Sequence, residues 1–164
     1  MSLPRERHVA RITEVDHGLE LSPSIAAAPA LGDEAYLADG EDDWGPREVL
    51  AHIAEAAPYW HGELERILAG DAGAPVPFGR TPTDAARLAI LSRDRSLPAF
   101  VLLDQLARET DALVPRLARL SDADLDRLGL HPVRGPQTVQ AMIERSLTGH
   151  FEGHLTQLRT LTGA

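Results

Sequence analysis

Long apolar stripes with helical spacing constrain the fold of this chain more than any other feature of its sequence. The clearest stripe follows Gly45-Pro46, where proline stands at the first position of a helix and its missing N–H costs nothing. We expect this helix to end at Gly70 and to be kinked at Pro58, which removes one backbone hydrogen bond. The apolar positions of the stripe are Val49, Leu50, Ile53, Ala57, Trp60, Leu64 and Ile67.

Further stretches show the same periodicity. We expect the first helix from about Leu3 to Leu19 and the last from about Thr138 to Leu161. Between them, a stretch interrupted at Ser96-Leu97-Pro98 continues as a seam of apolar residues three and four positions apart. These stripes comprise Val9, Ile12 and Leu19; then Leu103, Leu106, Thr110, Leu113, Leu117 and Leu120; and finally Val139, Ile143, Leu147, Leu158 and Leu161.

The segments between the stripes contain the helix-breaking residues. Residues 22–43 hold several prolines and glycines around an Ala-rich part, and loops are expected at Asp71–Pro82 and Gly129–Pro136. Ser121 is expected to cap a short extra turn. No stretch combines period-two alternation with β-branched residues. The sequence therefore predicts an all-α fold, a four-helix bundle with long connections, and its 164 residues fit one domain, 1–164.

Composition restricts the chemistry. The chain has no cysteine, which excludes thiolate nucleophiles and leaves His, Asp and Glu to build any transition-metal site. The formal net charge is -9 and the arginines are scattered along the sequence, so we expect no basic patch and no nucleic-acid partner. No apolar run approaches the roughly 20 residues that cross a bilayer, and the N-terminus lacks a signal-peptide core. We therefore expect a cytoplasmic protein with no membrane partner that acts on a small molecule.

Two histidines lie on the apolar stripe of the last predicted helix. His150 and His154 are four positions apart and so project from one face, one turn apart. That spacing lets two imidazoles reach one metal ion, which would satisfy two polar groups that point into the core. The alternative is that each is a hydrogen-bonded core histidine without a metal.

His52 is the best candidate for a third ligand, because it lies at the edge of its helix's apolar stripe and can reach a neighbouring helix. Considered alone, it could equally be a surface residue. His61 lies about half a turn away from it on the same helix, so the two are not expected to share an ion. His8, His17 and His131 fall in segments interpreted as surface or loop, and we treat them as non-ligands.

Two segments, in this order, resemble the DinB-like superfamily of bacterial metal-binding four-helix bundles. One is Trp44-Gly-Pro-Arg-Glu-Val-Leu-Ala-His52-Ile-Ala; the other is Gly135-Pro-Gln-Thr-Val139 followed by His150-x-x-x-His154-x-x-Gln157-Leu158. Together with the helix layout, the resemblance covers nearly the whole chain. It implies a bundle with a long crossover connection, three histidines on one divalent ion, and a homodimer.

Three neutral imidazoles leave coordination positions open, as in catalytic rather than structural sites. Zinc or nickel suits such ligands, and the bound ion can acidify water or polarise a substrate oxygen or thiol. Similar proteins include bacterial thiol S-transferases and a mycothiol-dependent maleylpyruvate isomerase, so the resemblance implies a low-molecular-weight thiol such as bacillithiol or mycothiol. The chain has no room for the extra C-terminal domain of some thiol-dependent isomerases, which argues against that activity.

Candidates for further catalytic groups are few. Tyr59 and Glu63 lie on the His52 side of their helix, and Gln157 lies beside His154. Ordinary packing and a solvated charge are the alternatives for Tyr59 and Glu63, while an amide such as Gln157 orients a ligand rather than transferring protons. Three functions stay open at this point: a metal-dependent thiol transferase, a metal-dependent hydrolase, and a non-catalytic bundle that a metal stabilises.

Overall fold

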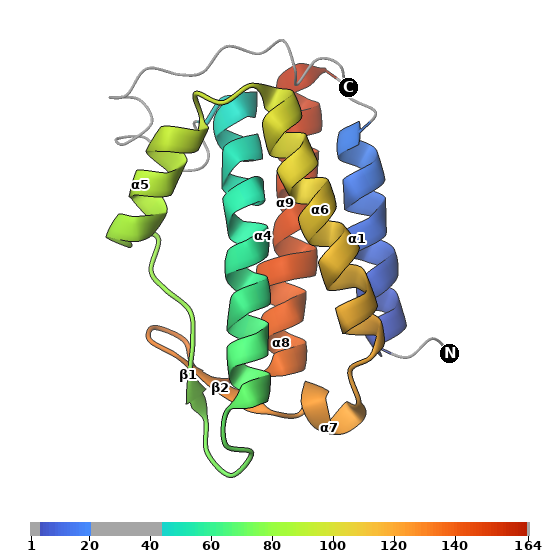
Figure 1. Cartoon of the computed structure of the whole chain (residues 1–164), viewed down its shortest axis with the longest axis vertical. Helices are drawn as coiled ribbons and strands as arrows, with labels where there is room; N and C mark the ends of the chain where they lie inside the picture. Colours follow the sequence, from blue (N-terminus) through green and yellow to red (C-terminus); the bar gives the residue numbers. More distant parts are fainter. Residues whose placement is uncertain (1–3, 21–43, 164) are drawn as a thin grey trace.

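The computed structural model describes residues 4–20 and 44–163, and the expected Pro/Gly-rich connection at 22–43 lies outside these residues (Figure 1). Long helical rods run side by side and confirm the predicted all-α, four-helix bundle. The rods are α1 (Pro4–Glu20), α4 (Pro46–Ala69), α6 (Ala99–Ala118) and a final rod made of α8 (Val139–Ile143), the π-helical turn η2 (Glu144–Thr148) and α9 (Gly149–Thr162).

The order of the rods around the bundle requires long connections. Both α1 and α4 pack against α6 and α9, so α1 and α4 occupy opposite corners. Figure 1 shows that α4 and α6 run in the same direction, opposite to α1 and α9. Two parallel neighbours cannot be joined by a tight turn, and the connection from α4 to α6 contains β1 (Val76–Pro77) and α5 (Ala85–Asp94), which packs on α4. This is the expected crossover.

The core consists largely of the predicted stripes. Every apolar position of the α4 stripe is buried, and in α6 only Leu103 of the seam is partly exposed. Trp44 and Trp60 are both buried in this core, and α4 continues unbroken through Pro58. Within the described residues, no helix combines the length and the hydrophobicity that crossing a membrane requires.

The last rod differs from the single regular helix that the sequence predicts. Thr138 caps its start by accepting a hydrogen bond from the Ala141 N–H at 3.1 Å, but the π-helical turn then inserts an extra residue. One extra residue rotates everything that follows by about 100°. The prediction that Leu161 belongs to the buried stripe is wrong: it lies in the last turn of α9 and is 43% exposed, whereas Leu158, one turn earlier, is buried as predicted.

A small sheet closes one end of the bundle, where the sequence predicts loops. Ser121 caps the short helix α7 (Asp122–Leu125) as expected, and β2 (Leu128–His131) and β3 (Gly135–Thr138) then form an antiparallel hairpin. β1 pairs parallel to β2, with Val76 opposite Gly129. The loop prediction for 129–136 is therefore wrong at both ends of this range, which belong to β2 and β3. The sequence does not reveal these strands because each is only four residues long and they contain glycine and proline. Gly129 is needed there, since a Cβ would lie 2.5 Å from the Phe78 ring.

Candidate metal centre

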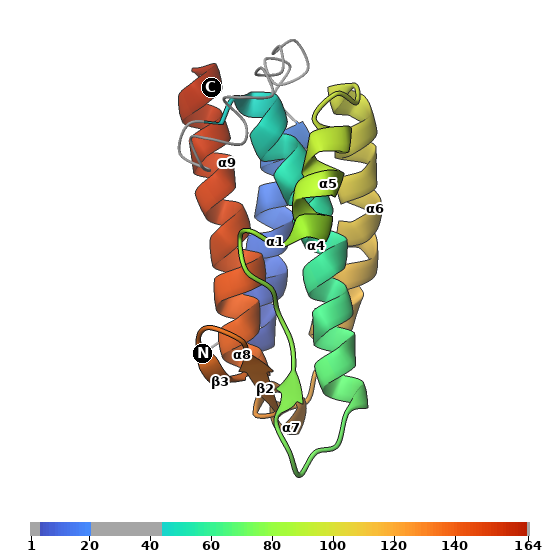
Figure 2. The ribbon, with the colours of Figure 1, turned by 90° about the vertical axis from the view of Figure 1, so that its left-hand side faces the viewer.

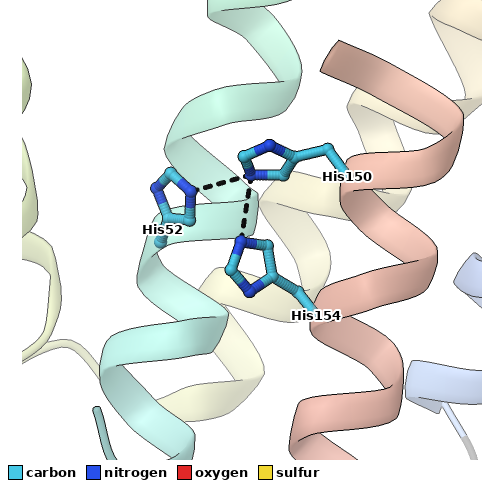
Figure 3. Close-up of side chains that lie close together, drawn as sticks. All are labelled: His52, His150 and His154. Atoms are coloured by element: carbon cyan, nitrogen blue, oxygen red, sulfur yellow. Dashed lines mark hydrogen bonds between the residues drawn. The ribbon is translucent and has the colours of Figure 1, made fainter. Parts of the chain in front are cut away.

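Three imidazole rings meet between two adjacent rods, as Figure 3 shows. His52 projects from α4, and His150 and His154 project from α9, one turn apart. The Nε2 atom of His150 lies 2.8 Å from Nε2 of His52 and 3.0 Å from Nε2 of His154. The sequence-predicted set is therefore brought together, and His52 is buried rather than a surface residue.

The π-helical turn fixes where the pair on α9 points. Gly149 follows this turn directly and precedes His150, and its N–H donates to the carbonyl oxygen of Glu144. A Cβ at Gly149 would lie 2.7 Å from that backbone oxygen, so only glycine allows this close approach. The irregular turn thus sets the rotation of α9 that directs both histidines toward α4.

Burial keeps the cluster in the form that binds metals. Desolvation lowers the pKa of His52 well below its ordinary value, with smaller contributions from His150 and His154. Desolvation likewise lowers the pKa of His150 to about 3, aided by the neighbouring His154. Both rings are consequently neutral at physiological pH, and a neutral imidazole has a nitrogen lone pair available for a metal.

Gln157 defines the tautomer of His154. Its Oε1 lies 2.9 Å from Nδ1 of His154, and because an amide oxygen only accepts, Nδ1 carries the proton and donates it. In the neutral ring this tautomer leaves the lone pair on Nε2, which faces the ring of His150. A hydrogen bond of this kind behind a metal-ligating histidine orients the ring and raises its basicity. The predicted proximity of Gln157 to His154 is confirmed.

These residues fit a divalent ion. Tetrahedral ligation by imidazoles at about 2.0–2.1 Å places the nitrogens about 3.3 Å apart. Two of the pairs lie at 2.8 and 3.0 Å, and all three ligand atoms lie within 4.8 Å of one another, so the rings need only small movements. One contact does not match: Nη2 of Arg87 lies 3.5 Å from Nδ1 of His52. Ligation through Nε2 places the proton of His52 on Nδ1, where it would face a second donor. Metal binding therefore requires the Arg87 guanidinium to move away from the ring.

A cavity of about 180 Å³ opens beside the cluster and is lined by His52 and His150. Four arginines also line it, and no aspartate or glutamate does; they are Arg80, Arg87, Arg134 and Arg145. The expectation that no basic patch forms is wrong at this position. The arginines come from the β1–α5 connection, α5, the hairpin turn and η2, and only the fold brings them together. In the view of Figure 2, the β1–α5 connection runs between α4 and the last rod, in front of α1.

Tyr59 and Glu63 lie near Arg80 and its neighbour Gly79 rather than near the three histidines. The Arg80 guanidinium lies 3.7 Å from the centroid of the Tyr59 ring, and Glu63 accepts a hydrogen bond from the Gly79 N–H at 2.5 Å. Burial, and then the nearby Glu63, raise the pKa of Tyr59 to about 12, so its hydroxyl stays protonated. Both residues line a second cavity of about 790 Å³, which shares Arg80 with the first. The catalytic roles predicted for them stay predictions.

The other histidines stand apart from the cluster. His61 pairs with Glu109, as expected for a residue on another face of α4, and His17 is exposed. The interpretation of His8 and His131 as surface or loop residues is wrong, since both are buried. His8 lies in α1 with its Nδ1 3.6 Å from Glu144, and His131 ends β2. Neither is part of the three-histidine cluster.

The chain belongs to the DinB superfamily, whose sequence model matches residues 23–158. This match confirms the family resemblance carried by the His52 and His150/His154 segments. No curated protein matches the chain.

Solved structures with the same fold include two of described activity. YfiT from Bacillus subtilis, a probable metal-dependent hydrolase with an unusual four-helix bundle topology, is 19% identical, with a TM-score of 0.66 over 97% of this chain and 87% of that one. The mycothiol-dependent maleylpyruvate isomerase is 15% identical, with a TM-score of 0.67 over 95% of this chain, which spans 61% of the isomerase. An uncharacterised protein from Clostridium difficile 630 is 15% identical, with a TM-score of 0.64, covering 98% and 96%. At these identities the likeness shows the fold alone.

Proposed function

We propose that this protein is a metal-dependent enzyme in which His52, His150 and His154 hold one divalent ion, zinc or nickel. The observation that carries this proposal is the convergence of three Nε2 atoms from two rods beside an open cavity. Nitrogen ligands of this kind suit zinc and nickel, and three of them leave positions for water or substrate. When bound, the ion would polarise a substrate atom and lower the pKa of a ligated water or thiol.

The reaction that we propose is transfer of a low-molecular-weight thiol, such as bacillithiol or mycothiol, to an electrophilic small molecule. The cavity beside the histidines has no acidic lining residue. A thiol that binds a metal loses its proton without a protein base, so this lining is compatible with a thiol nucleophile. The fold shared with a mycothiol-dependent enzyme supports the same proposal.

Hydrolysis is the second candidate, because the protein of this fold from Bacillus subtilis is described as a probable metal-dependent hydrolase and is matched over 87% of its length. In that reaction a ligated hydroxide would be the nucleophile. Tyr59 and Glu63 line the adjoining cavity and are the candidates for contacts to substrate in either reaction, with Gln157 orienting His154. A non-catalytic, metal-stabilised bundle is the third possibility.

A conjugation assay separates these functions. Metal-loaded, metal-free and His52→Ala proteins are mixed with bacillithiol, mycothiol or glutathione and an electrophile, with His61→Ala as the control from the same helix. We expect faster conjugation with one thiol only in the metal-loaded wild type and the control. Background rates with all three thiols would contradict the transferase. Ester or amide hydrolysis that disappears in His52→Ala would support the hydrolase instead.

We also propose that the protein is a homodimer, as the family resemblance implies. Light scattering at micromolar concentration should give about twice the chain mass of 17.8 kDa. A monomer under those conditions would contradict the dimer.

A further inference from the structure

The cavity beside the histidines is strongly cationic in a chain of net charge -9. Four of the chain's 16 arginines line it, and none of its lining residues is acidic. A divalent ion on three neutral imidazoles would add positive charge without any protein anion among its ligands. A site of this composition attracts anions and holds them where water is partly excluded.

Two of the four arginines are held by protein groups. Arg80 donates to the buried Glu55 at 2.6 Å and lies over the Tyr59 ring. Arg87 is buried and donates to the carbonyl oxygen of Pro82 at 2.8 Å. These contacts hold the side chains of Arg80 and Arg87 at the wall of the cavity, and Glu55 neutralises the charge of Arg80.

Arg134 and Arg145 differ from the other two. Arg134 lies in the turn between β2 and β3, and Arg145 lies in η2. Among the described residues, no carboxylate forms an ion pair with either. Both side chains are exposed where they line the cavity. Desolvation, and then the charge of Arg145, lower the pKa of Arg134, so the two like charges are close enough to repel each other. An anion between them would remove that repulsion.

We propose that the cavity binds a carboxylate or phosphate group of the substrate or of its thiol, through Arg134 and Arg145. This inference rests on the proposed function, because it places the anionic group next to His150 and the open metal positions. Guanidinium groups bind such oxygens through paired hydrogen bonds in a fixed planar geometry. The ligand class is therefore an anionic small molecule.

The two cavities divide such a ligand into two parts. A volume of about 180 Å³ is below the roughly 300 Å³ of a typical small-molecule pocket and fits a head group only. Arg80 also lines the cavity of about 790 Å³, which would have room for the remainder of a ligand that extends past this side chain. Tyr59 then contacts the body of the ligand, while the arginines contact its anionic end.

Calorimetric titration with two simple anions tests the proposal. Malonate and inorganic phosphate are titrated into metal-loaded wild type, Arg134→Gln, Arg145→Gln and the double variant, with uncharged malonamide as the ligand control. Arg119→Gln is the matched variant, since it removes the same charge from an exposed arginine that lines none of the cavities described here. Charge-assisted hydrogen bonds are worth enough that each single substitution should weaken anion binding about tenfold or more. The preferred anion identifies the head group as carboxylate or phosphate.

Metal content, measured on the same samples, separates this inference from the proposed function. We expect the arginine variants to keep their metal, Arg119→Gln to bind anions like the wild type, and malonamide not to bind. Equal anion affinity in the double variant and in Arg119→Gln would overturn the proposal. A different outcome is a wild type that takes up no metal but still binds anions through Arg134 and Arg145. That result would support the anion site and refute the metal-dependent function.

Discussion

The last rod has two polar sides that differ in how their charged groups are paired. We call them the paired side and the open side. On the paired side, Arg11 of α1 donates to Glu144 at 2.6 and 2.8 Å and to Glu152 at 2.6 Å. On the open side, His150 lines a cavity together with Arg134 and Arg145, two arginines that form no ion pair with a described carboxylate. Glu144 and Arg145 are adjacent in the sequence, yet the rod directs them to different sides.

We interpret the paired groups as stabilising the fold and the unpaired groups as available to a ligand. Where acceptors match donors within the protein, as around Arg11, nothing further is needed and the network joins α1 to α9. Where imidazoles and guanidinium groups that pair with no described carboxylate line a cavity, as around His150, the protein leaves polar groups that a ligand can satisfy. Groups of this kind concentrate at functional sites. Substitutions on each side should therefore affect different properties.

The largest effect should come from Gln157→Leu on the open side. Leucine removes the acceptor for the proton on Nδ1 of His154, so the ring loses its fixed tautomer and orientation. We expect the affinity for zinc to fall about 10- to 100-fold, as is usual when the outer partner of a ligating histidine is lost. Competition with a zinc chelator measures this. The exposed neighbour Thr156→Ala is the control, and equal affinities for the two variants would contradict the assigned role of Gln157.

Two glycines of α9 test whether the π-helical turn positions the histidines. A Cβ at Gly149 meets the backbone oxygen of Glu144 at 2.7 Å, whereas a Cβ at Gly153 has no heavy atom within 4 Å. We expect Gly149→Ala to lower the free energy of unfolding by about 1–2 kcal/mol and to reduce zinc affinity. Gly153→Ala should be neutral or stabilising by up to about 1 kcal/mol, because alanine favours helix. Chemical denaturation gives both values, and similar destabilisation in the two variants would refute the account of the turn.

The features predicted from the sequence are those with a local, periodic signal. The helices have apolar positions every three or four residues, and His150 and His154 share a face through spacing alone. His52 could be added because it lies at the edge of an apolar stripe on a second helix. The π-helical turn has no such signal, and the apolar spacing does not show that Leu161, in the last turn of α9, is exposed.

The arginines of the cavity could not be predicted, and neither could the hairpin. Arg80, Arg87, Arg134 and Arg145 come from four segments that only the tertiary structure brings together. The strands β2 and β3 are too short for a period of two to be visible, and pairing rather than propensity forms them. His131 is buried because it lies in β2, a strand that the sequence pattern does not reveal.

Removing the paired side should affect stability and leave metal binding unchanged. Arg11→Met keeps the aliphatic part of the side chain but loses both carboxylate partners. These partners are partly exposed, so we expect a loss of only about 1 kcal/mol in the free energy of unfolding. Arg108→Met, which breaks a fully surface pair with Asp104, should have a smaller effect. A fall in zinc affinity in Arg11→Met would show that the two sides are not independent.

The smallest effect should be a pH dependence at His131, which lies on neither side. Burial lowers its folded-state pKa, and its Nδ1 accepts hydrogen bonds from the N–H groups of Val133 at 3.2 Å and Arg134 at 3.3 Å. The unfolded chain therefore binds a proton more readily than the folded protein. This contribution to stability is present above the unfolded pKa of about 6.5 and is lost as the pH falls toward the folded value.

Denaturation at pH 7 and pH 5, with a chelator present, measures this contribution. We expect His131→Asn to show a smaller loss of stability between the two pH values than the wild type, by less than about 1 kcal/mol. The buried His8 contributes in the same direction because desolvation lowers its pKa, so some pH dependence persists in the variant. An unchanged difference between the two pH values would show that His131 can be protonated in the folded protein.

The metal content of untagged protein tests the central claim most directly. Elemental analysis of the purified wild type, after incubation with zinc and nickel and removal of excess ions, should give one divalent ion per chain. The His150→Ala/His154→Ala variant should retain less than about a tenth of that amount, because one remaining imidazole binds a divalent ion weakly. Equal metal content in the two proteins, or no metal in the wild type, would contradict the assignment of His52, His150 and His154 as a metal centre.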